Sequence, residues 1–142
     1  MAPEPGAPVG KQVDGEMLSA ISTGIVKLHR ECFGKGPTGA KTYVLDDAVI
    51  CVLRDGFTAL ERTLFESGKG EKVREVRAAF EEAIADRFIE VVESATGQRV
   101  VAFVSQAHIA PDLVVQSFFL DRSFSGNGSL VTDGDGNHVE DQ

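Results

Sequence analysis

The chain has 142 residues, of which 42% are hydrophobic, and its formal net charge is −8 at pH 7. That length suits one domain with a single core rather than two domains. An acidic chain without clustered Lys and Arg argues against binding to nucleic acid or to anionic lipid, since both need a basic surface.

The two ends differ in composition from the middle of the chain. Residues 1–13 are rich in Pro, Gly and Ala, and residues 121–142 are rich in Ser, Gly, Asn and Asp. Such stretches bury too little apolar area to offset the entropy of ordering them. We therefore expect a disordered tail over residues 1–13, one folded domain over 14–120, and a disordered acidic tail over 121–142.

The first predicted helix runs from Asp14, a suitable N-cap, to Phe33. Its apolar residues recur at spacings of three and four, so they share one face: Leu18, Ile21, Ile25, Leu28 and Cys32. Gly24 lies inside this helix and weakens it by roughly 1 kcal/mol relative to Ala, so packing must hold it. Gly34 follows as a structural cap, because glycine takes the left-handed conformation without steric cost.

A hairpin is expected next. Residues 41–45 and 48–53 have the β-branched side chains that suit a pleated surface, and the two residues Asp46 and Asp47 join them. Thr58 and Glu61 then stand in the spacing of a capping box, which predicts a short helix that ends near Gly68.

A long helix is predicted over residues 71–96, closed by Gly97 as a structural cap. Its expected apolar face again follows spacings of three and four: Val73, Val76, Phe80, Ile84, Phe88, Val91 and Ala95. The stripe of Glu82, Asp86 and Glu90 should be solvated. No histidine stands at helical spacing to these acids, so they do not predict a metal site.

Two further strands are expected over residues 99–105 and 113–120, with a loop over 106–111. Both contain apolar residues on both faces in places, which suits central strands or a sheet face covered by a partner. The predicted fold is therefore α+β, in the order helix, hairpin, helix, helix, hairpin. It has a four-stranded antiparallel sheet with helices packed on it.

The segment 34–42 superficially resembles a phosphate-binding loop. That pattern needs Lys directly after its second glycine, and here Ala40 intervenes. The segment also closes a helix and leads into a strand, which is the reverse of the usual context, and Pro37 removes one N–H donor. A structural turn is the preferred interpretation. In the C-terminal tail, residues 133–137 imitate the start of an EF-hand loop, but His138 replaces the required glycine, so no calcium site is predicted.

No local catalytic motif stands out. His29, His108 and His138 lie on a helix, a loop and a tail, without a neighbouring nucleophile pattern. Cys32 and Cys51 are expected to be reduced core residues. We predict no catalytic residue, no metal and no cofactor. No stretch approaches the roughly 20 apolar residues of a membrane span, so we expect a cytoplasmic protein without direct membrane insertion.

Several short segments, in their order and spacing, together resemble the MpsC-type domain family, named for a Na⁺-translocating membrane-potential-generating system. They are Gly34-Lys35-Gly36-Pro37 after a helix, the strand pair 42–50, and the segments 58–64, 73–77, 97–100 and 118–120. The resemblance covers about residues 17–120. The chain departs from the family pattern at Phe57, where Leu is usual, and at Gln106, where an acid is frequent.

The resemblance implies a small accessory of a membrane system that couples bicarbonate or cation movement to membrane potential. It implies no established catalytic residue, and transport itself would belong to partner subunits.

Two functional hypotheses follow. The first is a non-enzymatic interaction module, because the second strand pair is unusually apolar. Its expected partners are a second copy, in a dimer, or a membrane-system protein. The rival is a sensor or enzyme that holds a small anion, bicarbonate or phosphate. The candidate binding residues are Lys35, Gly36, Pro37, Thr38, Arg62 and Arg77.

Overall fold

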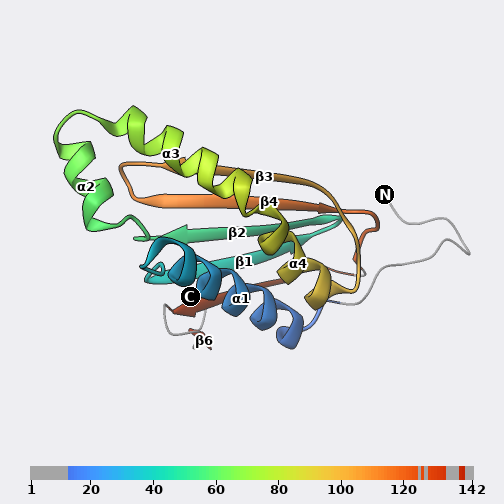
Figure 1. Cartoon of the computed structure of the whole chain (residues 1–142). Coiled ribbons are helices and arrows are strands. Elements are labelled where there is room, and N and C mark those ends of the chain that lie inside the picture. The colour runs from blue at the N-terminus through green and yellow to red at the C-terminus, as the bar shows by residue number, and fades with distance from the viewer. Residues whose placement is uncertain (1–12, 125, 127, 134–137, 140–142) are drawn as a thin grey trace, which may run out of the picture.

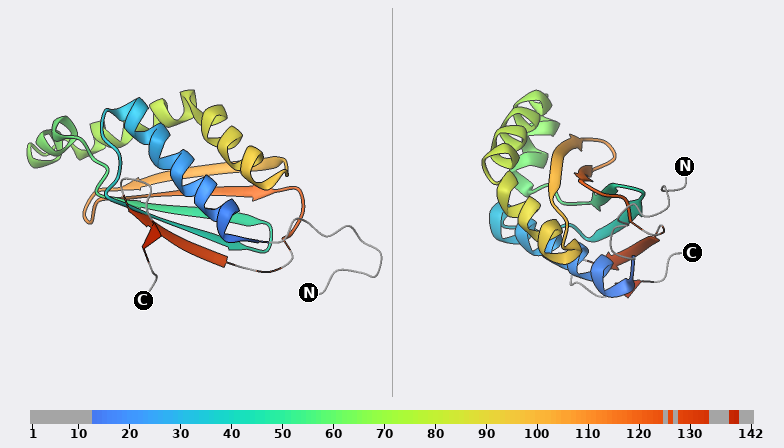
Figure 2. Two further views of the ribbon diagram at one scale, coloured as in Figure 1. Left: turned by 90° about the horizontal axis from the view of Figure 1, so that it is seen from below. Right: turned by 90° about the vertical axis from the view of Figure 1, so that its right-hand side faces the viewer.

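The computed structural model describes residues 13–124, 126, 128–133 and 138–139. Within these residues, four helices lie on one side of an antiparallel sheet (Figures 1 and 2), so the α+β class is confirmed. The elements are α1 (Gly15–Phe33), β1 (Gly39–Leu45), β2 (Ala48–Arg54), α2 (Ala59–Glu66), α3 (Gly70–Ala83), α4 (Ala85–Thr96), β3 (Val100–His108), β4 (Leu113–Leu120), β5 (Gly128–Asp133) and β6 (His138–Val139).

The sheet is larger than the four strands expected. Its order is β3-β4-β2-β1-β5-β6, so five strands of six or more residues are joined by the two-residue β6. Strand β5 pairs with β1 from Gly39 to Val44. Phe124 is also buried, and its amide donates to the Asp46 carbonyl at 2.8 Å.

The prediction of four strands was therefore wrong. Residues 121–142 were assigned to a tail because of their composition, yet the edge of β1 supplies backbone hydrogen-bond partners that composition alone does not reveal. Residues 1–12 of the predicted N-terminal tail lie outside the described residues. So do residues 125, 127 and 140–142, and residues 134–137, which are the last four of the five residues in the EF-hand-like segment.

Helix α1 begins and ends as its sequence predicts. The Asp14 side chain accepts a hydrogen bond from the Met17 amide at 2.8 Å, and Gly34 closes the helix with a φ of 77°. The predicted apolar face is buried from Leu18 to Leu28, while Cys32 is half-buried. This face packs on β1, β5 and α4.

The β1–β2 hairpin turns at Asp46 and Asp47, with Leu45 opposite Ala48. Along both strands, burial alternates from residue to residue, as expected when one face of a sheet meets a helical layer. Thr58 and Glu61 form both hydrogen bonds of the capping box at the start of α2.

The predicted long helix is two helices. The chain leaves helical geometry at Ile84, where φ is −109° and ψ is 10°, and α4 then runs on to Gly97, which caps it with a φ of 69°. The two helices pack on different neighbours, because α3 contacts α2 and β3 whereas α4 contacts α1 and β3. A single straight helix with one apolar stripe could not contact both sets of neighbours.

The buried face of α3 also differs from the expected one. Val73 is buried as predicted, but Val76 is 65% exposed, and the other buried positions are Arg77 and Glu81. Core aromatic residues come instead from α4 and the strands, where Phe88 and Phe118 are fully buried. The stripe of Glu82, Asp86 and Glu90 is exposed, as predicted.

The face of the sheet opposite the helices is here called the open face. No helix of the described chain covers it (Figure 2), and its strands are in register, with Val104 opposite Ser117 and Ser117 opposite Ile50. Val104 and Phe119 on this face are 57% and 37% exposed. The apolar centre of the open face consists of Tyr43, Ile50, Val52, Val104, Val115 and Phe119.

Candidate functional site

Arg77 is the most deeply buried charged side chain of α3, with 2% of its surface exposed. Its Nε and Nη2 atoms donate to the two carboxylate oxygens of Glu61 at 2.6 and 2.9 Å, and Nη2 also donates to the Gly56 carbonyl at 3.0 Å. The guanidinium carbon lies 4.3 Å from the ring centre of Phe33 and 4.6 Å from that of Phe57. The carboxylate, the carbonyl and the two aromatic rings together offset the cost of burying this cation.

Glu61 has two roles in this arrangement. Its Oε1 accepts from the Thr58 amide at 2.9 Å, and its own amide donates to the Thr58 hydroxyl at 3.2 Å, which completes the capping box of α2. Burial alone would raise the pKa of Glu61, but hydrogen bonds from Arg77 and Thr58 and the Arg77 charge outweigh it and lower that pKa. The carboxylate therefore stays ionised while it joins α2 to α3.

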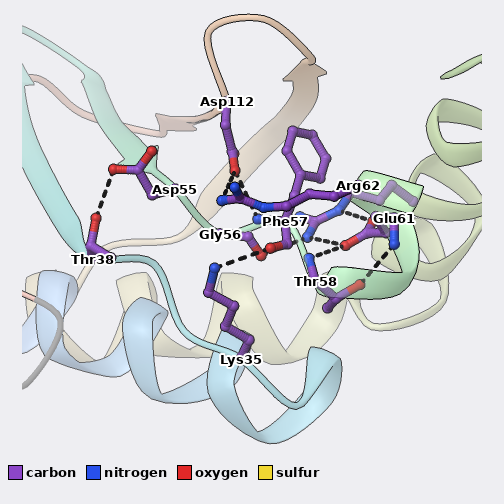
Figure 3. A network of polar contacts seen from close by, with 10 residues as sticks. Lys35, Thr38, Asp55, Gly56, Phe57, Thr58, Glu61, Arg62 and Asp112 are labelled. Carbon is purple, nitrogen blue, oxygen red and sulfur yellow. Dashed lines mark hydrogen bonds and ion pairs between the residues drawn. The ribbon is translucent and has the colours of Figure 1, made fainter. Parts of the chain in front are cut away.

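The glycine turn after α1 closes on the loop at 55–57 (Figure 3). Lys35 donates from Nζ to the Phe57 carbonyl at 3.1 Å, and the Thr38 hydroxyl donates to Asp55 at 2.8 Å. Pro37 is buried, and its Cβ would lie 3.7 Å from a side chain added at Gly56. The turn therefore contacts this loop through side chains that the anion-binding hypothesis assigned to a ligand.

Arg62 is linked to the same loop through Asp112. Its Nη2 lies 3.6 Å from a carboxylate oxygen of Asp112, and that oxygen also accepts from the Phe57 amide at 3.1 Å. Asp112 comes from the turn between β3 and β4, and its carbonyl accepts from the Asp55 amide. The sequence prediction omitted Asp112, and its position just after Pro111 carries no signal beyond that of a turn.

The structure thus brings the predicted residues Lys35, Thr38 and Arg62 to one loop (Figure 3). Arg77 donates to the Gly56 carbonyl of the same loop, and Gly36 and Pro37 belong to the turn that carries Lys35 and Thr38. Each of the four polar side chains contacts a group of the same chain. An anion at this loop would have to compete with those internal partners.

A second buried polar cluster lies farther along α3. Glu81 is 4% exposed, and one of its oxygens accepts from the Ser105 hydroxyl at 2.8 Å. Gln116 stands directly opposite Ser105 on β4. Burial raises the pKa of Glu81, and the Ser105 hydrogen bond, the Arg77 charge and Gln116 only partly oppose this. Glu81 is therefore easier to protonate than an ordinary glutamate.

This second cluster is incompletely hydrogen-bonded. The Oε1 atom of Glu81, both amide atoms of Gln116 and the Nε2 atom of His29 are buried without a hydrogen-bond partner among the described residues. Gln116 influences the pKa of both Glu81 and His29, so its amide lies close to both side chains.

His29 connects the cluster to the aromatic core. It is 3% exposed and lies between Phe33 and Phe88, with ring-centre distances of 5.3 and 5.2 Å. Burial, and secondly the charge of Arg77, lower its pKa to about 4, so the imidazole is uncharged at neutral pH. It supplies an aromatic packing surface with one polar edge.

The cross-strand row of the sheet that contains Ser105 and Gln116 is polar across the core. Ser105, Gln116, Cys51 and Thr42 stand opposite one another on β3, β4, β2 and β1. The Thr42 hydroxyl lies 2.5 Å from that of Ser22 on α1 and 3.6 Å from the Cys51 sulfur. Burial raises the pKa of Cys51 to about 12, so this thiol is a poor nucleophile.

Two adjoining pockets give access to Glu81 between α3 and β3. Their volumes are about 160 and about 210 Å³, and both are lined by Ala78, Glu81 and Ser105. The smaller pocket also contains Arg74 and Arg77 in its wall. A small polar ligand would meet carboxylate, hydroxyl and guanidinium groups here.

The described residues contain no group of three or more His, Cys, Asp or Glu side chains placed to hold a metal ion. No helix in this part of the chain combines the length and the apolar character needed to cross a bilayer.

Sequence reasoning found Arg77 but not Glu81 or Gln116. A usable signal was present, because Val73, Arg77 and Glu81 form one row at spacings of four. When an apolar residue begins a row on a packed helix, charged residues farther along that row are candidates for buried, paired groups. Gln116 occupies an inward position of β4 and could be recognised by strand alternation.

Comparison with curated proteins and comparison with solved structures both give no match. A family model described as "Na+-translocating membrane potential-generating system (MpsC)" matches residues 13–122, which include every helix, the strands β1 to β4 and both polar clusters. The chain therefore belongs to the MpsC family.

Proposed function

We propose that this chain is a non-enzymatic interaction module of a membrane-potential-generating system, and that a protein partner docks on the open face. The family description supplies the system. The observation that carries the interaction role is the apolar centre of the open face, which runs across β3, β4, β2 and β1. Contiguous exposed apolar surface of this kind is typical of protein contacts.

The energetic case rests on side chains that remain in contact with water. Leu45, Val104 and Phe119 are 46%, 57% and 37% exposed. Complete burial of one such side chain contributes roughly 1.5–3 kcal/mol relative to full exposure, so several part-exposed ones together make a useful contact. Lys41, whose amine lies 5.0 Å from the Tyr43 ring centre, provides a charged rim.

The proposal is tested in cells of the source species that lack the gene. Membrane potential is measured with a potential-sensitive dye after the wild-type chain or a variant is restored. The double variant Val52→Thr/Val115→Thr keeps β-branched shape but makes the centre of the open face polar. We expect the wild-type chain to restore the potential and this variant to fail at equal expression and folding.

The control is Val76→Thr, a single Val→Thr change at an exposed position of α3 outside the open face. It should restore the potential fully. Restoration by the open-face variant, or a normal potential in cells without the gene, would remove the proposal.

The second candidate is a small-anion sensor that uses the smaller pocket beside Arg77. It is favoured by Arg74 and Arg77 in the wall of a pocket of about 160 Å³, with the Ser105 hydroxyl nearby. It is opposed by Glu81 in the same wall and by the internal partners of Lys35 and Arg62.

Thermal unfolding with bicarbonate, phosphate and chloride at constant ionic strength tests this second candidate. An anion that binds should raise the melting temperature of the wild-type chain but not that of Arg74→Gln, which removes one cation from the pocket wall without disturbing the buried Arg77 pair. The absence of any anion-specific shift would dismiss it.

A further inference from the structure

Strand β3 forms one edge of the sheet in the described chain, since it pairs only with β4. Its nine residues, Val100–His108, contain no Lys, Arg, Asp, Glu or Pro. Its only irregularity lies between Val100 and Ala102, so the seven residues that follow are regular. Edge strands are normally protected by charges, proline or bulges. The regular part of β3 has none of these features.

Helix α3 and strand β3 run in opposite directions along this edge. The pocket at one end is lined by Arg74 together with Gln106 and Ala107. The pocket at the other end is lined by Glu82 together with Phe103. Ala78 and Ser105 line both pockets, so Ala78 lies above Ser105 midway along the edge. The two pockets show that space remains between the helix and the strand.

We propose that a second copy of this chain pairs with the first along the β3 edge, in an antiparallel arrangement about a two-fold axis near Ala78 and Ser105. This inference goes beyond the proposed function, because it uses the β3 edge and not the open face. Two identical antiparallel strands form a self-complementary interface, which is the arrangement that two-fold symmetry requires. The pairing would join both sheets into one.

The same axis gives a charge match between the two α3 helices. Residues four positions before and after Ala78 are Arg74 and Glu82, and both are exposed. A two-fold axis at Ala78 places Arg74 of each copy opposite Glu82 of the other, so the ion pair forms twice. The small Ala78 side chain at the centre lets the helices approach closely.

Electrostatics make this edge the favoured meeting point. Each copy carries a net charge of −8, which disfavours most random encounters between copies. The uncharged β3 strand and the reciprocal Arg74–Glu82 pairs avoid that repulsion. Arg74 already lies 3.3 Å from Glu71 within its own helix, but both side chains are at least half exposed, so that contact is readily exchanged.

The test is sedimentation equilibrium of the full chain over a wide concentration range. The wild-type chain should form a dimer. Arg74→Glu and Glu82→Arg should each raise the dimer dissociation constant by about tenfold or more, since each creates two like-charge contacts. The double variant Arg74→Glu/Glu82→Arg should recover most of the wild-type affinity, because the charge match is restored with its sign reversed.

Two further variants separate an edge contact from a general charge effect. Val104→Lys places a charge on the edge strand and should weaken the dimer. Glu90→Arg makes the same reversal as Glu82→Arg at an exposed position on α4 and should leave the dimer unchanged. Circular dichroism of each variant confirms that the monomer remains folded.

A wild-type chain that stays monomeric, single reversals without effect, or a double variant that does not recover would each overturn this dimer. The proposed function has a separate readout, because Val52→Thr/Val115→Thr lies on the open face and should still dimerise. A monomeric chain that restores the membrane potential would therefore refute the dimer and leave the interaction role standing.

Discussion

Arg77 of α3 holds the Glu61 carboxylate side-on, with Nε–Oε2 and Nη2–Oε1 distances of 2.6 and 2.9 Å. Because Glu61 also completes the capping box of α2, one buried ion pair fixes the start of one helix to the middle of the next. The loop at Gly56 and Phe57 lies between them and contacts the same guanidinium. The Glu61 carboxylate therefore both caps α2 and holds α2 against α3.

Loss of this pair should destabilise the fold strongly. Arg77→Met removes the cation and leaves Glu61, whose side chain is 13% exposed, without its charged partner. Breaking a buried pair in this way typically costs about 3–5 kcal/mol. Urea unfolding should therefore show a loss of that order. Arg74→Met on the exposed side of the same helix should change stability by less than about 0.5 kcal/mol. Equal losses for the two variants would contradict the assignment.

The buried carboxyl of Glu81 should make stability depend on pH in an unusual direction. Its pKa is raised in the folded chain, so its contribution is most favourable below the unfolded value of about 4.3 and is lost as pH rises through the folded pKa. Glu61 acts in the opposite sense, because its lowered pKa adds stability above the unfolded value that is lost as pH falls. The difference in unfolding free energy between wild type and a Glu81 variant isolates the pH dependence due to Glu81, because Glu61 is present in both.

Glu81→Gln keeps an oxygen that can accept from Ser105 and removes the charge. The free energy of unfolding of this variant, relative to that of wild type, should be higher at pH 7.5 than at pH 4.5. Urea unfolding at both pH values measures this difference. The groups around Glu81 that also carry charge, Arg77 and Glu61, are unchanged in the comparison. Glu90→Gln, which removes one charge at an exposed position of α4, serves as the control. A pH-independent effect of Glu81→Gln would argue that the carboxyl titrates normally.

His29 predicts a second, separable pH effect. Its folded pKa is about 4 against an ordinary value of 6.5, so the unfolded chain takes up the proton first as pH falls. Stability should decline between pH 6.5 and about 4, and the gap between the two pKa values corresponds to about 3 kcal/mol. His29→Gln should flatten this part of the profile, whereas the exposed His108→Gln should not. A profile that is the same in both variants would exclude His29 as the source.

The features that the sequence predicted well are those set by neighbouring residues. Asp14, Gly34, Thr58, Glu61 and Gly97 all act as caps where expected, because a cap depends on backbone groups within a few positions. The β1–β2 turn is local in the same sense. The candidate residues Lys35, Arg62 and Arg77 also gather around one loop, although their role as ligand-binding groups remains a prediction.

The features that the sequence did not reveal depend on distant partners. Spacings of three and four continue through Ile84, so the end of α3 is decided by what each helix packs against. Glu81 was not singled out from the sequence, because its partner Ser105 is 24 positions away. Strand β5 has little apolar content of its own and forms on the edge of β1. Composition cannot identify a strand that takes its stability from another one.

Gly24 offers a test of close packing between α1 and α4. A Cβ atom added there would lie 2.6 Å from a methyl carbon of Val91, a side chain whose branching leaves it few alternative rotamers. Helix propensity alone favours Gly24→Ala by about 1 kcal/mol, but the clash should outweigh this and give a net loss of about 1–3 kcal/mol in urea unfolding.

Two variants decide whether contact with Val91 is the cause. Gly15→Ala, in the same helix but with open space around the added carbon, should be neutral or stabilising. Val91→Ala makes room beside Gly24, so Gly24→Ala introduced into that background should no longer destabilise, and the cycle should show a coupling energy of about 1 kcal/mol or more. Additive losses in the double variant would mean that Gly24 is needed for another reason, such as the local path of the α1 backbone.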